Sequence, residues 1–352
     1  MNAFVPLSSL VVRSVDLSDP TERARIERFV ARQADAQLFH NPAWSLGAER
    51  GCRQHAHCLI AEDGQGLRGL LPLTEMRSAL FGSALVSTGF GVGGGIIGDG
   101  VNELADAALA LAAKLRVASV ELRGGPVPAG WEMREGVYAG FVRDLPKDDE
   151  EILKAIPRKQ RAEVRRAQTL GLQVRVGCSD ADLADHYAVY SESVRNLGTP
   201  VFPRTLFRAM FDSWGEDADI LTVTKDGRAI ASVFSIYFNG AVHPYWGGGT
   251  AEARGLRANE HMYHALMRHA AARGCTRFDF GRSKLGTGAY AYKKNWGFEP
   301  EPLRYAVRSV DGAPLREVNP LSPKYRLQVQ LWQKLPLPVA NLLGPFLSRG
   351  LG

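Results

Sequence analysis

Cysteine is scarce in this chain, and its placement excludes a zinc knuckle or a disulfide framework. The four cysteines, Cys52, Cys58, Cys178 and Cys275, are scattered along the 352 residues, and no two of them form a C-x-x-C pair. Structural zinc sites use closely spaced cysteine pairs, and small secreted domains contain many more cysteines for their size. Reduced thiols in a cytoplasmic protein are therefore expected.

Long apolar runs are also missing. No stretch approaches the roughly 18 apolar residues that a membrane-spanning helix needs. The first residues, Met1 to Leu10, contain neither a basic segment nor a long apolar one, so a secretory signal is not expected. These absences again predict a protein of the cytoplasm.

The composition is otherwise that of an ordinary globular protein, with 45% apolar and 23% charged residues. A chain of 352 residues is too long for one small core and predicts two domains. The net charge of +6 is concentrated in the second half, because residues 1–145 hold 14 basic and 16 acidic side chains and the rest hold 29 and 21. This asymmetry indicates a phosphate-bearing ligand in the second half, and CoA, tRNA, a nucleotide-linked sugar and a lipid pyrophosphate all fit.

The sequence repeats itself at a spacing of about 155–163 residues. Each copy has the pattern of strand, tight turn, strand, glycine-rich segment, helix and strand. In the first copy the parts are 59–64, 69–73, 93–95, 102–116 and 119–124, the first range including the turn. In the second copy they are 221–227, 231–236, 247–249, 259–273 and 277–282. A Gly next to an Asp suits each tight turn, and Asn102 and Asn259 are the expected N-caps of the two helices.

This order of elements predicts the fold class. A helix that connects two strands implies a mixed sheet covered by helices, so we expect an α/β fold, or α+β with a mixed sheet. The charged, proline-containing stretch Asp144–Glu151 is typical of a linker. The expected organisation is two tandem domains, 1–145 and 146–312, followed by an apolar C-terminal tail, 313–352.

The element order resembles the core of a GNAT-type acyltransferase, so both domains are expected to be GNAT-like. A closer likeness lies between Phe278 and Tyr305, where FDFGRSKLGTGAYAYKKNWGFEPEPLRY resembles the FemAB-like and BioF2-like branch of the GNAT superfamily. It looks most similar to the FemAB-related proteins of exosortase (PEP-CTERM) and exopolysaccharide systems. Other segments extend the resemblance over nearly the whole chain: 38–44, 69–73, 157–161 and 332–352.

The resemblance implies an acyl or aminoacyl transferase that acts on a sugar or peptide acceptor in exopolysaccharide or cell-envelope biosynthesis. FemAB-type enzymes carry a Phe-Lys-x-x-Phe-like motif whose lysine supports transfer, and Tyr292-Lys293-Lys294-Asn295-Trp296 places Lys293 at that position. The aromatic residues here are Tyr and Trp, and the long helical arm of several tRNA-using members is not recognisable. Acyl-CoA and aminoacyl-tRNA both stay open as co-substrates, and no tightly bound cofactor is expected.

Acyl transfer needs a cation or hydrogen-bond donors for the oxyanion and a group that moves a proton. The candidate catalytic residues are Lys293, Tyr292, Arg282, Asp279 and Ser283. Lys293 would supply positive charge, and Tyr292, on a predicted strand with Tyr290, would act as an acid. Asp279 would orient Arg282 or accept a proton, and Arg282 and Ser283 end a strand, where α/β sheets place functional groups. The structural alternative is a solvated lysine pair, an Asp279–Arg282 ion pair and core aromatic rings.

A basic turn is the predicted site for the phosphates of the donor. Arg254, Gly255, Arg257 and Asn259 surround the expected start of a helix, whose free N–H groups and dipole attract anions. In GNAT enzymes, which this segment resembles, the corresponding loop holds the CoA pyrophosphate. A well-capped helix with a basic entry would give the same pattern.

A second basic surface is predicted on the helix that follows Pro157. Arg158, Arg161 and Arg165 recur there at three- and four-residue spacing and so share one face. This face would suit a phosphate-rich ligand or an anionic membrane surface, and a solvated face is the alternative.

Two other patterns do not support a site. Gly89–Gly94 satisfies G-x-G-x-x-G, but the next helical pattern starts only near Asn102, so a dinucleotide site is not expected. His261, His264 and His269 share a predicted helix without the spacing of a metal template, and no metal site is expected. The first domain has no counterpart of the lysine motif and is expected to be structural or to bind the acceptor.

The tail from Leu331 to Leu347 is apolar and broken by prolines, and it is too short to span a bilayer. It would lie on a membrane surface or pack on the protein, and packing is favoured. The expected partners are the acyl donor and the acceptor; tRNA and peripheral contact with the inner face of the membrane stay open, and DNA is not expected. The alternative to an enzyme is a catalytically decayed GNAT-like module that binds glycan or scaffolds a polysaccharide assembly complex.

Overall fold

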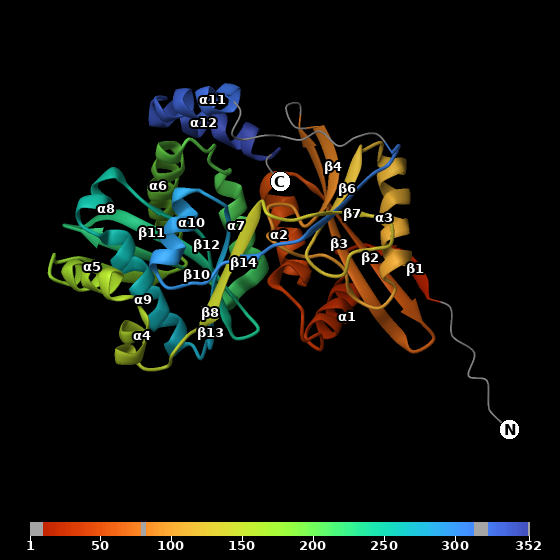
Figure 1. Cartoon of the computed structure of the whole chain (residues 1–352), viewed down its shortest axis with the longest axis horizontal. Coiled ribbons are helices and arrows are strands. Elements are labelled where there is room, and N and C mark those ends of the chain that lie inside the picture. The colour runs from red at the N-terminus through yellow and green to blue at the C-terminus, as the bar shows by residue number, and fades with distance from the viewer. Residues whose placement is uncertain (1–9, 79–81, 313–322, 351–352) are drawn as a thin grey trace. The chain divides into compact units, whose positions relative to one another are not determined.

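The computed structural model describes residues 10–78, 82–312 and 323–350. The chain forms two compact units, each with its own sheet and core (Figure 1). The first comprises Met1–Arg134, Arg304–Glu317 and Gly350–Gly352, and the second comprises Glu135–Leu303 and Val318–Arg349. Within the described ranges, no helix has both the length and the apolar character needed to cross a membrane. The segment on which the secretory-signal expectation rests lies outside these ranges, apart from Leu10.

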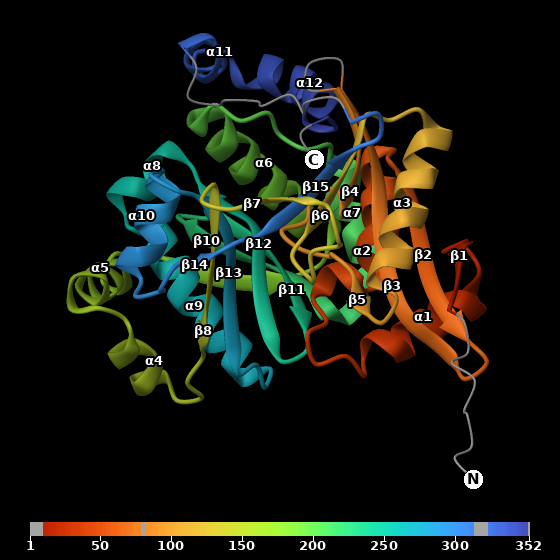
Figure 2. The ribbon, with the colours of Figure 1, turned by 45° about the vertical axis from the view of Figure 1, so that its right-hand side comes forward.

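The first unit is a mixed sheet with helices on both faces. Its elements are β1 (Val11–Val15), α1 (Pro20–Val30), the 3-10 turn η1 (Leu38–His40), α2 (Pro42–Cys52), β2 (His55–Asp63), β3 (Gly66–Ser78), β4 (Gly82–Ser87), β5 (Ile97–Gly98), α3 (Val101–Leu115), β6 (Ser119–Arg123), β7 (Glu132–Arg134) and β15 (Tyr305–Ser309). The strand order is β1-β2-β3-β4-β6-β15-β7, with β5 beside β3, and β4–β6 is parallel. Helix α3 covers one face, and α1 and α2 cover the other (Figure 2).

The second unit repeats this plan with additional helices, two of them at its C-terminal end. Its elements are β8 (Tyr138–Asp144), α4 (Asp149–Ala155), α5 (Arg158–Gln168), β9 (Gln173–Gly177), α6 (Asp180–Leu197), α7 (Arg204–Trp214), the 3-10 turn η2 (Gly215–Asp217), β10 (Ala218–Lys225), β11 (Arg228–Phe238), β12 (Ala241–Gly249), α8 (Ala251–Gly255), α9 (Ala258–Ala272), β13 (Arg277–Lys284), α10 (Gly288–Asn295), β14 (Glu301–Pro302), α11 (Pro323–Gln333) and α12 (Leu337–Ser348). The strand order is β14-β8-β13-β12-β11-β10-β9, and β12–β13 is parallel.

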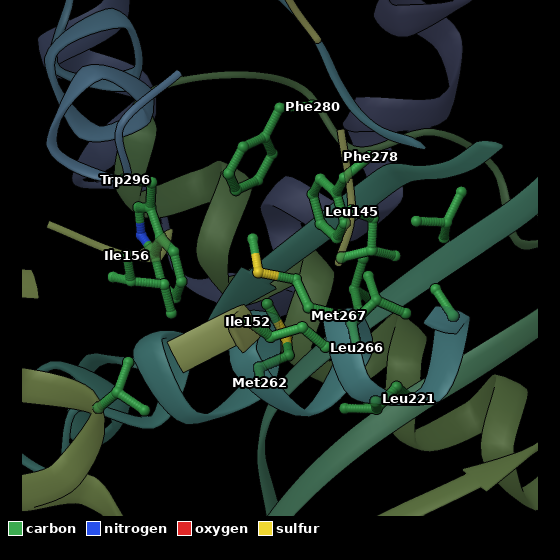
Figure 3. Close-up of a cluster of buried hydrophobic side chains, with 14 of the residues drawn as sticks. Leu145, Ile152, Ile156, Leu221, Met262, Leu266, Met267, Phe278, Phe280 and Trp296 are labelled. Atoms are coloured by element: carbon green, nitrogen blue, oxygen red, sulfur yellow. The ribbon is translucent and has the colours of Figure 1, made fainter. Parts of the chain in front are cut away.

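The core of the second unit lies between its sheet and α9. Met262 and Leu266 are spaced by four residues, so one face of the helix is apolar. Figure 3 shows these side chains and Met267 gathered near Phe278 and Phe280 of β13. Each fully buried apolar side chain of this size contributes about 1.5–3 kcal/mol through removal from water. This packing holds α9 and β13 in place and thereby positions the residues that follow the core part of β13.

The mixed α/β fold with two related halves is confirmed. Strands β2 and β3 form the predicted first hairpin, and β10 and β11 form the second. Helices α3 and α9 and the strands that follow them also lie where the repeat predicts them.

The two units are not the consecutive segments 1–145 and 146–312, because each sheet includes a strand from the other part of the chain. β8 precedes the predicted boundary at residue 145 but pairs with β13 in the second sheet. β15 follows β14 of the second unit in the chain but pairs with β6 in the first sheet. The stretch Asp144–Glu151, predicted to be an interdomain linker, lies inside the second unit, where it ends β8 and starts α4. The partner of a strand depends on residues far away in the chain, which a local pattern does not reveal.

The predicted strand that carries Tyr290 and Tyr292 is wrong. These residues lie in helix α10, whose N-cap is Thr287. The Thr287 Oγ1 accepts a hydrogen bond of 3.3 Å from the Tyr290 amide, a capping contact that favours a helix at this point. The alternation of aromatic residues over three positions was too short to distinguish the two periods.

The predicted N-caps are also wrong. Helix α3 has Gly100 as its N-cap and α9 has Arg257, both in the left-handed conformation. Asn102 lies inside α3 and accepts a hydrogen bond of 3.0 Å from the Ala129 amide with its side chain. Asn259 correspondingly lies in the first turn of α9. The Asn102 side chain therefore serves a contact outside the helix start.

Candidate functional site

Strands β12 and β13 run side by side only at their beginnings. Their parallel ladder consists of Ala241 with Arg277 and Val242 with Phe278. Beyond that point β12 continues along β11 to Gly249, and within the described residues it has no further ladder pairs with β13. Backbone groups on the open side of a strand can pair with the amides of a ligand. The divergence of β12 and β13 is therefore a place where an extended ligand can enter the sheet.

A bulge in β13 follows the divergence directly. The register with β8 shifts between Asp279 and Arg282, and Gly281 has φ of +66°, in the left-handed region that favours glycine. The Asp279 Oδ1 accepts a hydrogen bond of 2.8 Å from the Gly281 amide. The Asp-x-Gly sequence thus fixes the bulge locally, and the bulge turns the carbonyls of Gly281 and Arg282 toward α10.

A histidine–carboxylate pair bridges the two strands where they separate. His243 follows Val242, the last residue of β12 that pairs with β13. Its Nδ1 lies 3.3 Å from the Oδ2 of Asp279. Burial would raise the pKa of Asp279, but the hydrogen bond and charge of His243 and the Gly281 amide outweigh it and hold that pKa below its usual range. His243 is 9% exposed, and its Nε2 has no hydrogen-bond partner among the described residues. An imidazole held at Nδ1 with a free Nε2 can accept or donate a proton there.

Lys293 approaches the bulge from α10. Its Nζ donates hydrogen bonds to the carbonyl oxygens of Arg282 at 2.8 Å and Gly281 at 3.3 Å. It also lies over the rings of Phe141 and Phe280, 5.3 and 5.7 Å from their centroids. Burial lowers the pKa of Lys293 to about 8; the charge of Asp279 opposes this effect and that of Arg282 adds to it. Lys293 is thus not a solvated surface lysine, and its amine exchanges protons near neutral pH.

Several buried polar atoms around the divergence have no hydrogen-bond partner among the described residues. They are His243 Nε2 on β12, Ser283 Oγ on β13, and Tyr292 OH and Trp296 Nε1 at α10. An unsatisfied buried polar group costs about 1–3 kcal/mol, so proteins rarely gather several without a use. These atoms mark the region as a candidate functional site.

Tyr292 is held in its neutral form. Burial raises the pKa of its phenol well above the usual value, and the charge of Glu260 on α9 raises it further. A neutral phenol is a hydrogen-bond donor, as the predicted acid role requires. Ser283 is 5% exposed on the neighbouring strand. The guanidinium of Arg282 lies 4.7 Å from the centroid of the Tyr138 ring, whereas the Asp279 carboxylate contacts His243 and the Gly281 amide.

The predicted donor-binding residues lie at the other end of β12. Arg254 is exposed at the end of α8, and Gly255 has open space around its Cα. Arg257 caps α9 and forms an ion pair with Glu163 of α5, with Nε and Oε2 2.6 Å apart. Asn259 lies against Gly249, where an added Cβ would be 2.6 Å from its Oδ1. The end of β12 and the start of α9 are therefore in close contact, with one exposed and one paired arginine beside them.

The predicted basic face of α5 is only partly directed outward. Arg158 and Arg165 are exposed. Arg161 folds back, because its guanidinium donates hydrogen bonds to the carbonyls of Lys154 at 2.9 Å and Ile156 at 3.0 Å. Its charge thus helps to cap the end of α4, where free carbonyls need donors.

In the first unit the corresponding strands stay together. The parallel ladder of β4 and β6 covers four pairs, from Ala84–Ser119 to Ser87–Leu122. The amide of Arg123 then donates to Ser87 Oγ at 2.9 Å, and its buried guanidinium donates to the carbonyls of Thr88 and Gly91. In the first unit a buried arginine therefore joins β4 and β6 at their ends. At the corresponding point of the second unit, β12 and β13 separate.

The glycine-rich segment of the first unit is held by side chains of its own unit. His40 contacts the Gly95 carbonyl at 2.8 Å through Nε2, and Trp44 Nε1 donates to the Gly89 carbonyl at 3.0 Å. No helix opens at this segment, since α3 starts at Val101. The glycines of this segment allow close packing with these side chains.

The helical histidines pair with separate acids. His264 Nε2 lies 3.5 Å from Asp149, and His269 Nε2 lies 2.7 Å from Asp219. In the part of the chain that the structure describes, no three His, Cys, Asp or Glu side chains gather as potential metal ligands.

His243 is the functional candidate that the sequence analysis missed. The histidines of α9 drew attention because they are clustered, whereas His243 stands alone in a strand. The only local signal was its position shortly before Gly247–Gly249. Its partner, Asp279, is 36 residues away in sequence, so only the paired strands reveal the contact.

Comparison with known proteins gives a family match for part of the chain and similar solved structures. Residues 157–294 match the acetyltransferase (GNAT) domain family. No curated protein matches the chain in sequence. The chain is similar in structure to FemX, with a TM-score of 0.65 and 14% identity, over 83% of this chain and 96% of that one.

Two further structures are similar over most of their length. A tandem GNAT protein from the clavulanic acid biosynthesis pathway has a TM-score of 0.54 and 12% identity, over 87% of this chain and 99% of its own. The L-PGS of Bacillus licheniformis has a TM-score of 0.53 and 13% identity, over 94% and 96%. At these identities the likeness shows the fold alone. The chain therefore has the fold of two tandem GNAT-like domains, and residues 157–294 of its second unit match a GNAT acetyltransferase domain.

Proposed function

We propose that the second unit transfers an acyl group from an activated donor to an amine or hydroxyl of a sugar or peptide acceptor. The observation that carries this proposal is the divergence of β12 and β13, with the His243–Asp279 pair at its base and Lys293 at the bulge beside it. The match of this segment to a GNAT acetyltransferase domain supports a transferase.

The residues divide the chemistry between them. The acceptor amine or hydroxyl attacks the carbonyl carbon of the donor, a C–N or C–O bond forms, and the bond to the leaving thiol or alcohol breaks. His243 Nε2 takes the proton of the attacking group, while Asp279 fixes the imidazole through Nδ1 and stabilises its charged form. The Lys293 ammonium stabilises the oxyanion of the tetrahedral intermediate. The Tyr292 phenol or Lys293 returns a proton to the leaving group.

The donor is an acyl-CoA or an aminoacyl-tRNA. Exposed Arg254 beside the end of β12 and the exposed arginines of α5 supply the positive charge that a phosphate-bearing donor requires. The resemblance to FemAB-related and BioF2-like proteins of exosortase (PEP-CTERM) systems favours an acceptor of exopolysaccharide or envelope biosynthesis at the cytoplasmic side of the membrane. The first unit, in which Arg123 joins the parallel strands, serves as a scaffold or binds the acceptor.

The first experiment is a thermal-shift screen of the full chain with CoA, acetyl-CoA, longer acyl-CoAs and charged tRNA. A ligand that binds only the native state raises the melting temperature. A shift that Arg254→Ala reduces would assign the donor and locate its phosphates. The donor that binds is then used in transfer assays with sugar and peptide amines.

Three variants test the catalytic assignment: Lys293→Met, His243→Gln and, as the matched control, Lys294→Met at the exposed neighbouring position. The first two should lower kcat about 10²- to 10³-fold, with donor-induced thermal shift retained, because they remove oxyanion or proton-transfer groups. Lys294→Met should keep its activity. Full activity of Lys293→Met and His243→Gln would refute the mechanism. Absence of any donor shift would favour the alternative, a decayed GNAT-like module that binds glycan or scaffolds a complex.

A further inference from the structure

The two C-terminal helices attach to the second unit by one side. Both α11 and α12 contact α6, as Figures 1 and 2 show. The Gln333 Nε2 donates to the Asn196 carbonyl at 3.2 Å, and the Asn341 Nδ2 donates to Ser191 Oγ at 3.3 Å. These contacts hold α11 and α12 on α6, so the same side of each helix always faces away from the second unit.

Small residues form the inner side of α12. Ala340, Gly344 and Ser348 recur at four-residue spacing and are buried. An added Cβ at Gly344 would lie 2.8 Å from Val201 Cγ1, so α12 approaches the rest of the unit as closely as the backbone allows. The helix is therefore attached by its small residues, and its large apolar side chains point elsewhere.

Those large side chains are exposed. Leu342 and Phe346 at the centre of the outer side are 68% and 69% exposed. Apolar neighbours extend this surface along α12 and onto α11: Val339, Leu343, Leu347, Leu327 and Leu331, all between 39% and 58% exposed. A helix at a water interface normally carries polar residues outward, and a gathered apolar face marks an interaction site. Helix α12 has no charged residue at all.

The charge beside this surface indicates the chemistry of its partner. Helices α11 and α12 contain no aspartate or glutamate, and Lys334 and Arg349 flank α12. The guanidinium of Arg349 lies 5.8 Å from the centroid of the Phe346 ring, so a cation accompanies this exposed aromatic side chain. A symmetric contact with a second copy would bring these positive charges together, which is unfavourable. An anionic lipid surface meets the basic residues with opposite charge and the apolar residues with hydrocarbon.

We propose that α11 and α12 form an interfacial anchor that binds the surface of an anionic phospholipid bilayer through the outer side of α12. The 12 residues of α12 span about 18 Å, less than the roughly 30 Å hydrocarbon core, so the helix lies in the interface and does not cross it. Leu342 and Phe346 enter the boundary of the acyl chains, while Lys334 and Arg349 remain among the headgroups. This inference goes beyond the proposed transfer reaction and does not depend on it.

The test is co-sedimentation of the full chain with vesicles of phosphatidylglycerol and phosphatidylcholine, compared with vesicles of phosphatidylcholine alone. Binding should require the anionic lipid and weaken at high salt, because the basic residues are screened. Leu342→Asp with Phe346→Asp should reduce the partition coefficient at least about tenfold, and Leu342→Ser with Phe346→Ser should also reduce it, without added charge. Lys334→Glu should reduce it severalfold.

The matched control is Val127→Asp, which places the same charge at a 41% exposed valine of the first unit and should leave vesicle binding unchanged. Circular dichroism melts and the donor thermal shift check that the variants are folded, so loss of vesicle binding is separable from loss of the transferase site. Failure of the parent protein to bind anionic vesicles would overturn the proposal, as would unchanged binding of the Leu342 and Phe346 variants. A parent dimer without vesicle binding, made monomeric by those variants, would assign the surface to a second copy and overturn it as well.

Discussion

Replacement of Lys293 by methionine tests the electrostatic description of the site without an assay for the reaction. Methionine keeps an unbranched apolar stem but removes the amine, which is buried against the carbonyls of Gly281 and Arg282. Burial lowers the pKa of the Lys293 amine from its usual 10.5 to about 8. The difference corresponds to about 3 kcal/mol, at 1.36 kcal/mol per pH unit, by which folding disfavours the charged amine relative to the neutral one.

The direction of the effect follows from proton binding. Between about pH 8 and 10.5 the unfolded chain keeps the proton on Lys293, whereas the folded chain has lost it. The unfolded state thus binds more protons in this range, and the unfolding free energy contributed by this group rises with pH. In Lys293→Met the contribution is absent. The difference in unfolding free energy, parent minus variant, should therefore increase by about 2 kcal/mol between about pH 8.5 and 10.

Urea unfolding of the parent and Lys293→Met at several pH values measures this difference, since the other titrating groups are common to both proteins. Lys294→Met is the control, because it removes an exposed amine one residue away. Its difference from the parent should show no comparable rise. A pH-independent difference for Lys293→Met would mean that the Lys293 amine is not held in the buried site, and the assignment of Lys293 to the oxyanion would be refuted.

Two further outcomes follow from the structure. Gly249→Ala should lower the unfolding free energy by about 1–3 kcal/mol in denaturant titrations, because the added Cβ would lie 2.6 Å from Asn259 Oδ1. Gly255→Ala is the control: its added Cβ would have nothing within 4 Å, so the change should be neutral or slightly stabilising. Equal effects of the two substitutions would contradict the packing at Gly249. Burial lowers the pKa of His40 from 6.5 to about 4. Between these pH values His40 is protonated in the unfolded chain and neutral in the folded chain. The unfolding free energy should therefore fall by up to about 3 kcal/mol as the pH decreases through this range. His40→Gln should remove that part of the pH dependence, and an unchanged acid profile would show that His40 is not buried as a neutral ring.

Sequence patterns selected the residues of the candidate catalytic segment, and the structure shows where they lie. The motif around Lys293 selected Asp279, Arg282, Ser283 and Tyr292, and the structure places all of them on β13 and α10 around one bulge. Their roles are still proposals. The motif did not reveal which side chain Asp279 contacts, because that partner comes from another strand.

The sequence by itself determined the two-fold repeat, the hairpins, helices α3 and α9, and the mixed α/β class. These depend on local periodicity and turn residues, which operate within a few positions of each other. It also determined where the lysine motif stands and which residues of the tail are apolar.

Only the tertiary structure decided which strands pair and which side chains meet. The exchange of β8 and β15 between the sheets, the separation of β12 from β13, and the contact of His243 with Asp279 all join distant parts of the chain. The same holds for α12, whose sequence is mostly apolar and uncharged. Its small residues face the unit because only they permit close approach, and this packing leaves Leu342 and Phe346 outside. Such choices depend on the fit of surfaces that a linear pattern does not contain.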